Sequence, residues 1–352
     1  MSYVLQCHPD EKISSAQQHM KAYTKISGYE KLELSTQLVI AEAIKRGAKA
    51  EILDAQDELI RFQKGNHIEY TKAGTITHHE TYVTTNIIDN KYVCKKILKD
   101  HNINTPEGKI YENKKSAIED YSFFKPFKKV IKPKSTNCGV GIMILEPNAQ
   151  KSAYKKAIDL AFQYDQNIII EKFVEGIECR FLVINEQTIA IANRIPANII
   201  GDGKHTIQEL IALKNKDPKR GRGYERPLVY LTLDKIEKQI LKEQGFSPES
   251  KAKKHQQVFL RYNSNLSTGG DCIDYTEKVH TDYKKIAEKV AKILQKKVCG
   301  IDMIMQNHSK PSTTKNYSIL EVNKNPSLSM HNFPSEGKNR KVETYIVDIL
   351  GF

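Results

Sequence analysis

The sequence predicts a mixed α/β (α+β) fold, and three features of the 352-residue chain indicate it. A helical pattern runs directly into a strand pattern at residues 34–55, as in layered α/β structures. Amphipathic helix patterns then alternate with apolar strand patterns, and the last two strand patterns are VCGIDMIM and YSILEVN. Hydrophobic residues make up 39% and charged residues 28% of the chain, so there is enough apolar material for a core.

The N-terminal part of the sequence predicts a small α/β region. Residues 1–30 are polar and weakly periodic, and we expect an extension that packs on the body of the protein. Residues 31–89 should contain a helix that stops at Gly47, the strand AKAEILDA, and a hairpin that turns at Lys64-Gly65-Asn66. The apolar stripe expected on the helix consists of Leu34, Leu38, Ala41 and Ile44.

The remaining elements follow a break at Thr105-Pro106-Glu107-Gly108, which is a candidate boundary between lobes. A short helix, NKYVCKKILKDHN, precedes the break. After it, KKVIKPKSTNCGVGIMIL predicts a strand, a loop and a strand, followed by a helix over residues 149–164 and the strand NIIIEKFV, which is expected to continue through EGIECR. A capping box of Thr206 and Glu209 should open a further helix, and helices are also expected at residues 234–244 and 279–295.

Charge and cysteine usage limit the classes of function. The net charge is +13 and the pI is about 9.2, which fits nucleic-acid binding, an anionic small-molecule site or a solvated lysine-rich surface. The lysines are spread along the chain, which favours the last interpretation. The six cysteines form no CxxC pair, no apolar run reaches the roughly 18 residues of a membrane span, and MSYVLQCHPDEK is not a signal peptide pattern. We therefore expect a soluble cytoplasmic protein with free thiols.

Two neighbouring strand patterns carry acids among apolar residues. Glu321 and Asn323 are two residues apart at the end of YSILEVN, so their side chains should share a face. Asp302 stands alone in VCGIDMIM. Three oxygen donors from two strands suit a hard divalent cation such as Mg²⁺. The alternative is that Asp302 and Glu321 form structural ion pairs with Lys or Arg.

Three further segments carry candidate binding groups. Lys132 ends a strand before a loop containing Gly139 and Gly141, which suits phosphate binding, although an ordinary hairpin explains it equally well and no Walker or GxGxxG motif is present. Glu171 follows three isoleucines and asks for a hydrogen-bond donor such as an adenine amino group, or is simply a solvated strand end. Arg261 and Asn263 precede a Ser-Thr-Gly-Gly turn, which alone does not explain them.

Taken in order, these segments resemble the ATP-grasp carboxylate–amine ligases. Asn90-Lys91, VIKPK with its glycine loop, EKFVEGIE, GID and LEVNKNP carry the resemblance, over about residues 90–334. More narrowly, RIPANIIGDGKHTIQEL, LRYNSNLSTGGDCID and MHNFP are similar to the C-terminal half of bifunctional glutathione synthetases, and less closely to cyanophycin synthetases. The glutamate–cysteine ligase half is missing, and Cys138 occupies a lid position where a bulky apolar residue is expected.

The resemblance implies an ATP-grasp domain over residues 90–352, with a lid lobe at about 108–174 and the nucleotide held between two lobes. Lys91 and Lys132 would contact the α- and β-phosphates, and the loop with Ser135, Gly139 and Gly141 would close over them. Asp302, Glu321 and Asn323 would hold Mg²⁺, or Mn²⁺ in its place. The other implied nucleotide and substrate residues are Glu171 for the adenine amino group, Lys172, Phe173 and Val174 near the ring, Glu178 for the ribose, Arg261 for the transferred phosphoryl group, and Arg194 and Asn263 for the peptide substrate or the tetrahedral oxyanion.

The activity that the resemblance implies is ATP-dependent peptide-bond formation through an acyl phosphate. The expected substrates are γ-glutamylcysteine and glycine, with glutathione as the product. A ligase for another amino acid or peptide acceptor is the main alternative, and a non-catalytic ATP-binding protein or a nucleic-acid-binding protein is disfavoured. No nucleic acid or membrane partner is expected. A second copy of the chain and a separate glutamate–cysteine ligase are the candidate protein partners.

Overall fold

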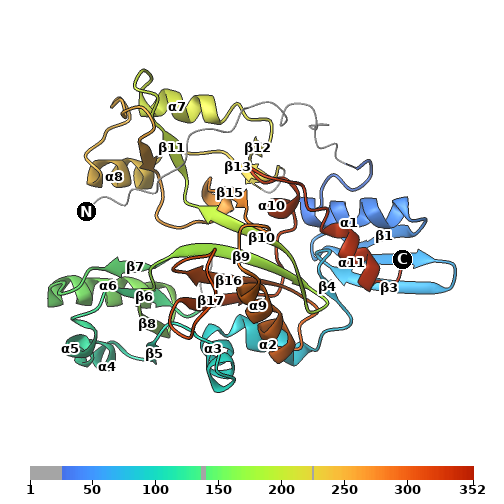
Figure 1. Cartoon of the computed structure of the whole chain (residues 1–352), viewed down its shortest axis with the longest axis horizontal. Helices are drawn as coiled ribbons and strands as arrows, with labels where there is room; N and C mark the ends of the chain where they lie inside the picture. Colours follow the sequence, from blue (N-terminus) through green and yellow to red (C-terminus); the bar gives the residue numbers. More distant parts are fainter. Residues whose placement is uncertain (1–25, 136–139, 224–225) are drawn as a thin grey trace.

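The computed structural model describes residues 26–135, 140–223 and 226–352, and the helices and antiparallel sheets in it confirm the mixed α/β fold class. A five-stranded sheet forms the centre of the molecule. Figure 1 shows the N-terminal unit and the lid lobe on opposite sides of this sheet, with a third lobe that carries α7 and α8 beyond its β15 edge. Among the described residues, no helix is long and apolar enough to cross a membrane.

The N-terminal unit is a helix beside a four-stranded antiparallel sheet in the order β1-β2-β3-β4. The predicted helix ending before Gly47 and the predicted hairpin are both confirmed, and Lys64 pairs with His67 across the turn. The predicted stripe is wrong in part, because Ile44 is exposed and Val39, Ile40 and Ala43 are buried instead. The elements are α1 (Leu34–Lys45), β1 (Lys49–Asp54), β2 (Leu59–Lys64), β3 (His67–Lys72) and β4 (Ile76–Thr77).

Two helices connect this unit to the lid lobe. The helix α3 (Lys91–Asp100) was predicted, and the Asn90 side chain caps it by accepting a hydrogen bond from the Val93 N–H. The preceding helix α2 (Tyr82–Asp89) was not predicted, because β-branched residues fill its first turns. Its signal is Thr81, whose side chain accepts a hydrogen bond from the Thr84 N–H.

The lid lobe is an antiparallel sheet in the order β5-β8-β6-β7, covered by helices. The predicted strand–loop–strand and the helix that follows it are confirmed. Phe124 and Tyr154 are fully buried in the core between the sheet and the helices. The elements are β5 (Gly108–Tyr111), α4 (Lys114–Glu119), α5 (Tyr121–Phe124), β6 (Lys129–Pro133), β7 (Met143–Leu145), α6 (Lys151–Tyr164) and β8 (Ile168–Lys172).

The central sheet has the order β15-β10-β9-β16-β17 and packs against α9. The stretch NIIIEKFVEGIECR, read as one strand, is two strands: β8 belongs to the lid sheet and β9 (Ile177–Ile184) to the central sheet. The closing strands β16 (Val298–Met305) and β17 (Tyr317–Asn323) are confirmed. The other elements are β10 (Gln187–Ile195), β15 (Asp271–Asp274) and α9 (Thr281–Ile293).

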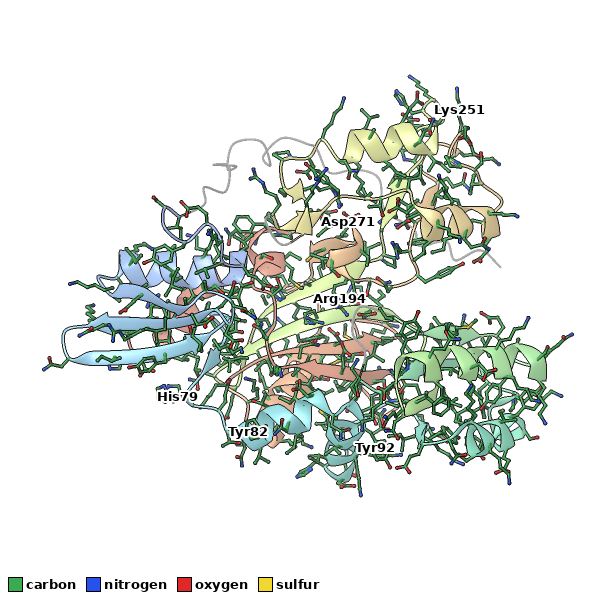
Figure 2. All side chains as sticks on the ribbon, turned by 180° about the vertical axis from the view of Figure 1, so that it is seen from behind. His79, Tyr82, Tyr92, Arg194, Lys251 and Asp271 are labelled. Atoms are coloured by element: carbon green, nitrogen blue, oxygen red, sulfur yellow. The ribbon has the colours of Figure 1, made fainter. Side chains whose placement is uncertain are left out.

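The third lobe lies between β10 and β15 in the chain, and the sequence did not predict it as a separate unit. The predicted capping box of Thr206 and Glu209 is confirmed. Figure 2 shows Arg194 and Asp271 near the middle of the molecule and Lys251 at the far end of this lobe. The elements are β11 (Asn198–Ile200), α7 (Ile207–Lys214), β12 (Arg220–Gly221), β13 (Leu228–Val229), α8 (Lys235–Glu243), β14 (Gln257–Phe259) and η2 (Leu266–Thr268); after β17 come α10 (Ser329–Asn332) and α11 (Glu343–Ile349), which packs on α1.

Candidate active site

The three predicted metal-binding residues converge on β16 and β17. Asp302 pairs directly with Glu321, and Gly300 pairs with Asn323. The Asn323 side-chain nitrogen lies 3.5 Å from one oxygen of each of the two carboxylates. A bulge follows the Asp302–Glu321 pair, and bulges of this kind re-aim side chains near active sites. The register therefore brings all three side chains to one place.

Two arginines surround Asp302, which is only 1% exposed. Arg180 on β9 binds it with two nitrogens, one of them 2.8 Å from Oδ2, and Arg194 on β10 lies 2.9 Å from the same oxygen. Burial alone would raise the pKa of Asp302, but the charges of Arg180 and Arg194 lower it to about 2. Asp302 is therefore ionised at neutral pH.

The donor set fits a divalent cation. Asp302, Glu321 and the Asn323 amide offer carboxylate and carbonyl oxygens, which are the ligands that Mg²⁺ prefers. The alternative of structural ion pairs is also realised for Asp302. Glu321 differs, because its side chain is 32% exposed and its cation partner, Lys91, is 3.4 Å away. Glu321 is thus the one of the two acids that a bound ion and its ligands reach more easily.

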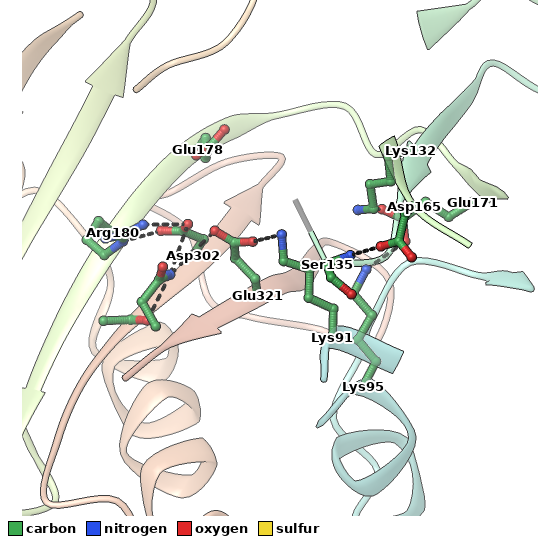
Figure 3. A network of polar contacts seen from close by, with 12 residues as sticks. Lys91, Lys95, Lys132, Ser135, Asp165, Glu171, Glu178, Arg180, Asp302 and Glu321 are labelled. Carbon is green, nitrogen blue, oxygen red and sulfur yellow. Dashed lines mark hydrogen bonds and ion pairs between the residues drawn. The ribbon is translucent and has the colours of Figure 1, made fainter. Parts of the chain in front are cut away.

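A second cluster of charges lies at the junction with the lid lobe. Lys132 on β6 contacts one oxygen of Glu171, and Lys95 on α3 lies 2.6 Å from the other. Figure 3 shows a row of charged side chains that runs from Arg180 and Asp302 through Glu321 and Lys91 to Lys95, Lys132 and Glu171. The predicted metal-binding acids and the predicted phosphate-binding lysines thus lie in two neighbouring clusters of one row, and Lys91 belongs to the cluster of Glu321.

The environment of Glu171 rules out a solvated strand end, because the residue is 4% exposed. Burial would raise the pKa of Glu171, but Lys132 and Lys95 lower it to about 2. Burial, with the nearby charge of Lys132, lowers the pKa of Lys95 to about 8. Sequence reasoning missed Lys95, although it stands four residues after Lys91 on the same helix and therefore on the same face.

Glu178, near the beginning of β9, and Arg194, near the end of β10, contact each other in the central sheet. Arg194 binds Glu178 as well as Asp302, and the Ser264 hydroxyl donates to Glu178 at 3.0 Å. The charges of Asp302 and Glu178 raise the pKa of the Arg194 guanidinium although burial opposes them. Arg194 therefore links the predicted ribose residue to the predicted metal ligand. Arg180 and Ser264, like Lys95, were not predicted as site residues.

The side chains of the segment after Glu171 do not all contact the charged row. Lys172 points to Glu107 at 2.7 Å and lies 3.7 Å from the centre of the Phe127 ring. Phe173 is half-buried, and its N–H donates to the Lys128 carbonyl at 2.8 Å. Val174 is also half-buried, and no described residue hydrogen-bonds to its backbone.

The predicted phosphate loop is described only at its ends. The Ser135 N–H donates to Asp165 at 2.6 Å. Gly141 has φ +72°, and a Cβ there would lie 2.7 Å from Pro133 and 2.8 Å from Tyr164, so a glycine is required. Gly139, like Cys138, lies outside the described residues.

Arg261 and Asn263 are not brought into the charged row. Arg261 pairs with Glu237 on α8 at 2.5 Å, and Asn263 accepts a hydrogen bond from the Thr268 hydroxyl at 2.7 Å. Their roles in phosphoryl and peptide binding stay predictions. A further candidate that sequence reasoning did not single out is His331, which is 3% exposed and has no described hydrogen-bond partner at either ring nitrogen. Burial, with nearby Arg180, lowers the pKa of His331 to about 3, so its ring is neutral.

Family models match three parts of the chain. An ATP-grasp-like domain matches residues 30–83, the D-ala D-ala ligase C-terminus matches residues 99–206, and a RimK-like ATP-grasp domain matches residues 254–341. The second model contains the lid lobe and the third contains Asp302, Glu321 and Asn323. The matches therefore include both ends of the charged row.

Relatives match nearly the whole chain. The glutathione biosynthesis bifunctional protein GshAB of Clostridium perfringens is 47% identical over 323 residues, which cover 92% of this chain and 42% of that protein. The protein of the same name from Mannheimia succiniciproducens is 40% identical over 336 residues, or 95% of this chain and 44% of that protein. The crystal structure of a bifunctional glutathione synthetase from Pasteurella multocida matches with a TM-score of 0.75 and 38% identity, covering 94% of this chain and 45% of that one.

The chain thus spans less than half the length of the relatives that it matches. The three ATP-grasp and ligase models, the similarity to these relatives and the arrangement of acids and lysines all agree with the resemblance found in the sequence. This chain belongs to the ATP-grasp ligase family.

Proposed function

We propose that this chain joins γ-glutamylcysteine to glycine with the energy of ATP, releasing glutathione, ADP and phosphate. The observation that carries the ligase chemistry is the charged row, in which three oxygen donors converge, Lys91 faces one of them, and Lys95 and Lys132 flank Glu171. The substrate rests on the relatives, whose names refer to glutathione biosynthesis and whose identity of 40–47% extends over more than nine-tenths of the chain.

The reaction needs activation because a free carboxylate does not react with an amine. In the proposed sequence, a carboxylate oxygen of γ-glutamylcysteine attacks the γ-phosphorus of ATP, the bond to ADP breaks, and an acyl phosphate forms. The glycine amine then attacks the acyl carbon, loses a proton, and phosphate leaves with the attacking oxygen. Most of the work of such an enzyme is to neutralise charge and to align the reacting groups.

The lysines would supply much of that neutralisation. Lys132 and Lys95 both bind Glu171, and Lys91 faces Glu321. Each ammonium group thus already binds an anionic oxygen, and a phosphate oxygen could take the place of that carboxylate or bind next to it. Asp302, Glu321 and Asn323 would hold Mg²⁺, which Mn²⁺ could replace. Such an ion would supply positive charge that stabilises the phosphate oxygens during transfer. Arg180 and Arg194 keep Asp302 ionised for that purpose.

The acceptor pocket is proposed to lie where three segments outside the nucleotide site meet. Arg194 and Ser264 both reach Glu178, and Ile195 pairs with Asp271 on β15. The Cys272 thiol donates to the Met330 carbonyl at 3.2 Å, which places the segment with His331 beside the same strand. A buried arginine and a neutral imidazole suit a dipeptide that carries two carboxylates and an amine.

Two further features bear on the setting of this activity. The γ-glutamylcysteine must be made by a glutamate–cysteine ligase reaction, either on a longer polypeptide that includes this chain or on a separate protein. The described cysteines Cys94, Cys179, Cys272 and Cys299 are buried free thiols, which supports a reducing compartment such as the cytoplasm.

A panel of acceptors tests the proposal. The purified chain is incubated with ATP and Mg²⁺, and ADP release is measured with γ-glutamylcysteine, other dipeptides and single amino acids, each with and without glycine. We expect release only when γ-glutamylcysteine and glycine are both present, and the tripeptide should be detected by mass. Turnover with a different pair would remove this substrate and keep the ligase class, whereas no turnover with any acceptor would contradict both.

A further inference from the structure

Three metal-ligating side chains outside the active site meet at the edge of the N-terminal sheet. Glu69 lies on β3, and His78 and His79 directly follow β4. The two strands are antiparallel, with Thr71 opposite Thr77. Continuing this register by two residues places His79 opposite Glu69, so the sequence pattern and the strand pairing bring the three residues together. Figure 2 shows His79 at the periphery of the molecule, away from Arg194.

The geometry of the three side chains is compact. One ligand atom from each of Glu69, His78 and His79 lies within 4.8 Å of the others. His78 Nδ1 is 2.7 Å from Glu69 Oε2, and the His78 and His79 ring centres are 4.1 Å apart. The histidines are exposed, whereas Glu69 is only 7% exposed. The arrangement therefore has a buried carboxylate at its base and two imidazoles open to solvent.

Glu69 Oε2 is close enough to His78 for an ion pair, but it receives no hydrogen bond from any described residue. This oxygen is buried, and its contact with His78 Nδ1 lacks hydrogen-bond geometry. His67 Nε2 stands 3.7 Å from the other oxygen but is bound to the Leu350 carbonyl at 2.7 Å. Two ligands of one ion approach each other closely without a hydrogen bond between them, since each bond to the ion is only about 2 Å long.

We propose that Glu69, His78 and His79 form a site for a divalent transition-metal ion, with Zn²⁺ as the best match. Two imidazole nitrogens and one carboxylate are ligands that Zn²⁺ takes, and a water can complete the four-coordinate sphere. Mg²⁺ is a poor match because it prefers oxygen ligands in an octahedral arrangement. The ion would fasten the connection between β4 and α2 to strand β3. The proposed Zn²⁺ site does not rest on the proposed ligase activity.

The test is metal binding by the whole chain, prepared without a polyhistidine tag and stripped of metal. Zn²⁺ is titrated calorimetrically, and Co²⁺ is titrated by its visible absorption, both with excess Mg²⁺ present to occupy oxygen-rich sites. We expect one tightly bound Zn²⁺ per chain and a Co²⁺ spectrum typical of nitrogen ligands. His78→Gln, His79→Gln and Glu69→Gln should each lower the affinity at least about ten-fold, because loss of a residue that only orients a metal ligand already costs that much.

The matched control is His205→Gln. His205 is exposed and lies 2.6 Å from Asp202, so it is a histidine–carboxylate pair without a second histidine or a buried acid. Its variant should bind Zn²⁺ like the wild type, and ADP release by the His78 and His79 variants should be unchanged, which shows that they fold. Wild-type chain that binds no Zn²⁺, or an affinity that survives the His78 and His79 changes, would overturn the proposal. Because Cys7, His8 and His19 lie outside the described residues, the variants decide where the ion binds.

Discussion

Glu321 is the most accessible acid of the candidate metal site, and it gives the sharpest single-residue prediction. Glu321→Gln keeps the shape of the side chain but removes the charge that faces Lys91 and a bound cation. We expect ADP release to fall on the order of 10²-fold or more, because charge stabilisation in the transition state is lost. The midpoint of thermal unfolding should stay near the wild-type value, since the side chain is partly exposed.

The control for Glu321 is Glu277→Gln, which removes another paired glutamate that is not part of the charged row. Glu277 is exposed and binds Lys338 and Arg340 on the surface. Its variant should keep wild-type turnover. Near-normal turnover of the Glu321 variant at ordinary Mg²⁺ concentration would show that Glu321 is not a metal ligand.

Glu171 should make the free energy of unfolding depend on pH in the acidic range. Lys132 and Lys95 outweigh burial and lower its pKa from 4.5 to about 2, so its stabilisation is complete above pH 4.5 and is lost as the pH falls toward 2. In the wild type, the free energy of unfolding should fall by on the order of 3 kcal/mol over this window because of Glu171. In the Glu171→Gln variant, this part of the pH dependence should be absent. Urea unfolding at a series of pH values measures it. The control is Asp159→Asn, which breaks an exposed ion pair with Lys114 and should leave the pH dependence of the unfolding free energy unchanged. A Glu171 variant with the same pH dependence as the wild type would show that its ion pairs with Lys132 and Lys95 do not have this role.

At this scale, the acids of the site could be predicted and their partners could not. Asp302, Glu321 and Glu171 stand out because each interrupts an apolar strand, which costs free energy unless a partner is near. The partners Arg180 and Lys95 lie 122 and 76 residues away along the chain. Which cation meets which acid depends on the pairing of β9 with β16 and on the packing of α3, and neither has a local sequence signal.

The connection between β8 and β9 is the element that joins the lid sheet to the central sheet. Gly176 in this connection has φ +148°, and a Cβ there would lie 2.4 Å from the Met305 carbonyl oxygen. Gly176→Ala should therefore cost at least about 2 kcal/mol of stability, against about 1 kcal/mol for Gly245→Ala, where φ is +80° and the space is open. Urea unfolding of both variants measures the difference. Equal losses would mean that the close contact with β16 is not maintained.

Elements with strong local signals were predicted well, and those set by tertiary packing were not. The strands β16 and β17 and the capped helix α7 have clear boundaries in sequence. The two strands β8 and β9 read as one, because nothing in FVEG announces a change of sheet. The buried face of α1 was misjudged because α11, from the other end of the chain, packs against it.

For the whole molecule, a buried ion pair holds the N-terminal region to the central sheet. Lys296, just before β16, lies 2.5 Å from Glu80, just before α2, and both side chains are buried. Glu80 also accepts hydrogen bonds from the Thr77 and Val298 N–H groups, each at 3.3 Å. Lys296→Met should cost about 3–5 kcal/mol, because it leaves a buried charge unpaired.

The double variant Lys296→Met with Glu80→Gln separates charge from packing. The glutamine keeps an acceptor for the N–H groups and removes the unpaired charge, so we expect it to recover most of the loss. Thermal and urea unfolding of the two single variants and the double variant form the cycle. A double variant that is no more stable than Lys296→Met alone would show that the pair does not work through its charge.

The most direct test of the account as a whole follows the oxygen atoms of the substrate. The purified chain is given ATP, Mg²⁺, glycine and γ-glutamylcysteine labelled with ¹⁸O in the cysteinyl carboxylate, and the phosphate and tripeptide are analysed by mass. Activation of that carboxylate by ATP predicts equal amounts of ADP and tripeptide, with one ¹⁸O transferred to each phosphate released. Tripeptide accompanied by unlabelled phosphate, or labelled dipeptide that stays unchanged while ATP is hydrolysed, would contradict the account.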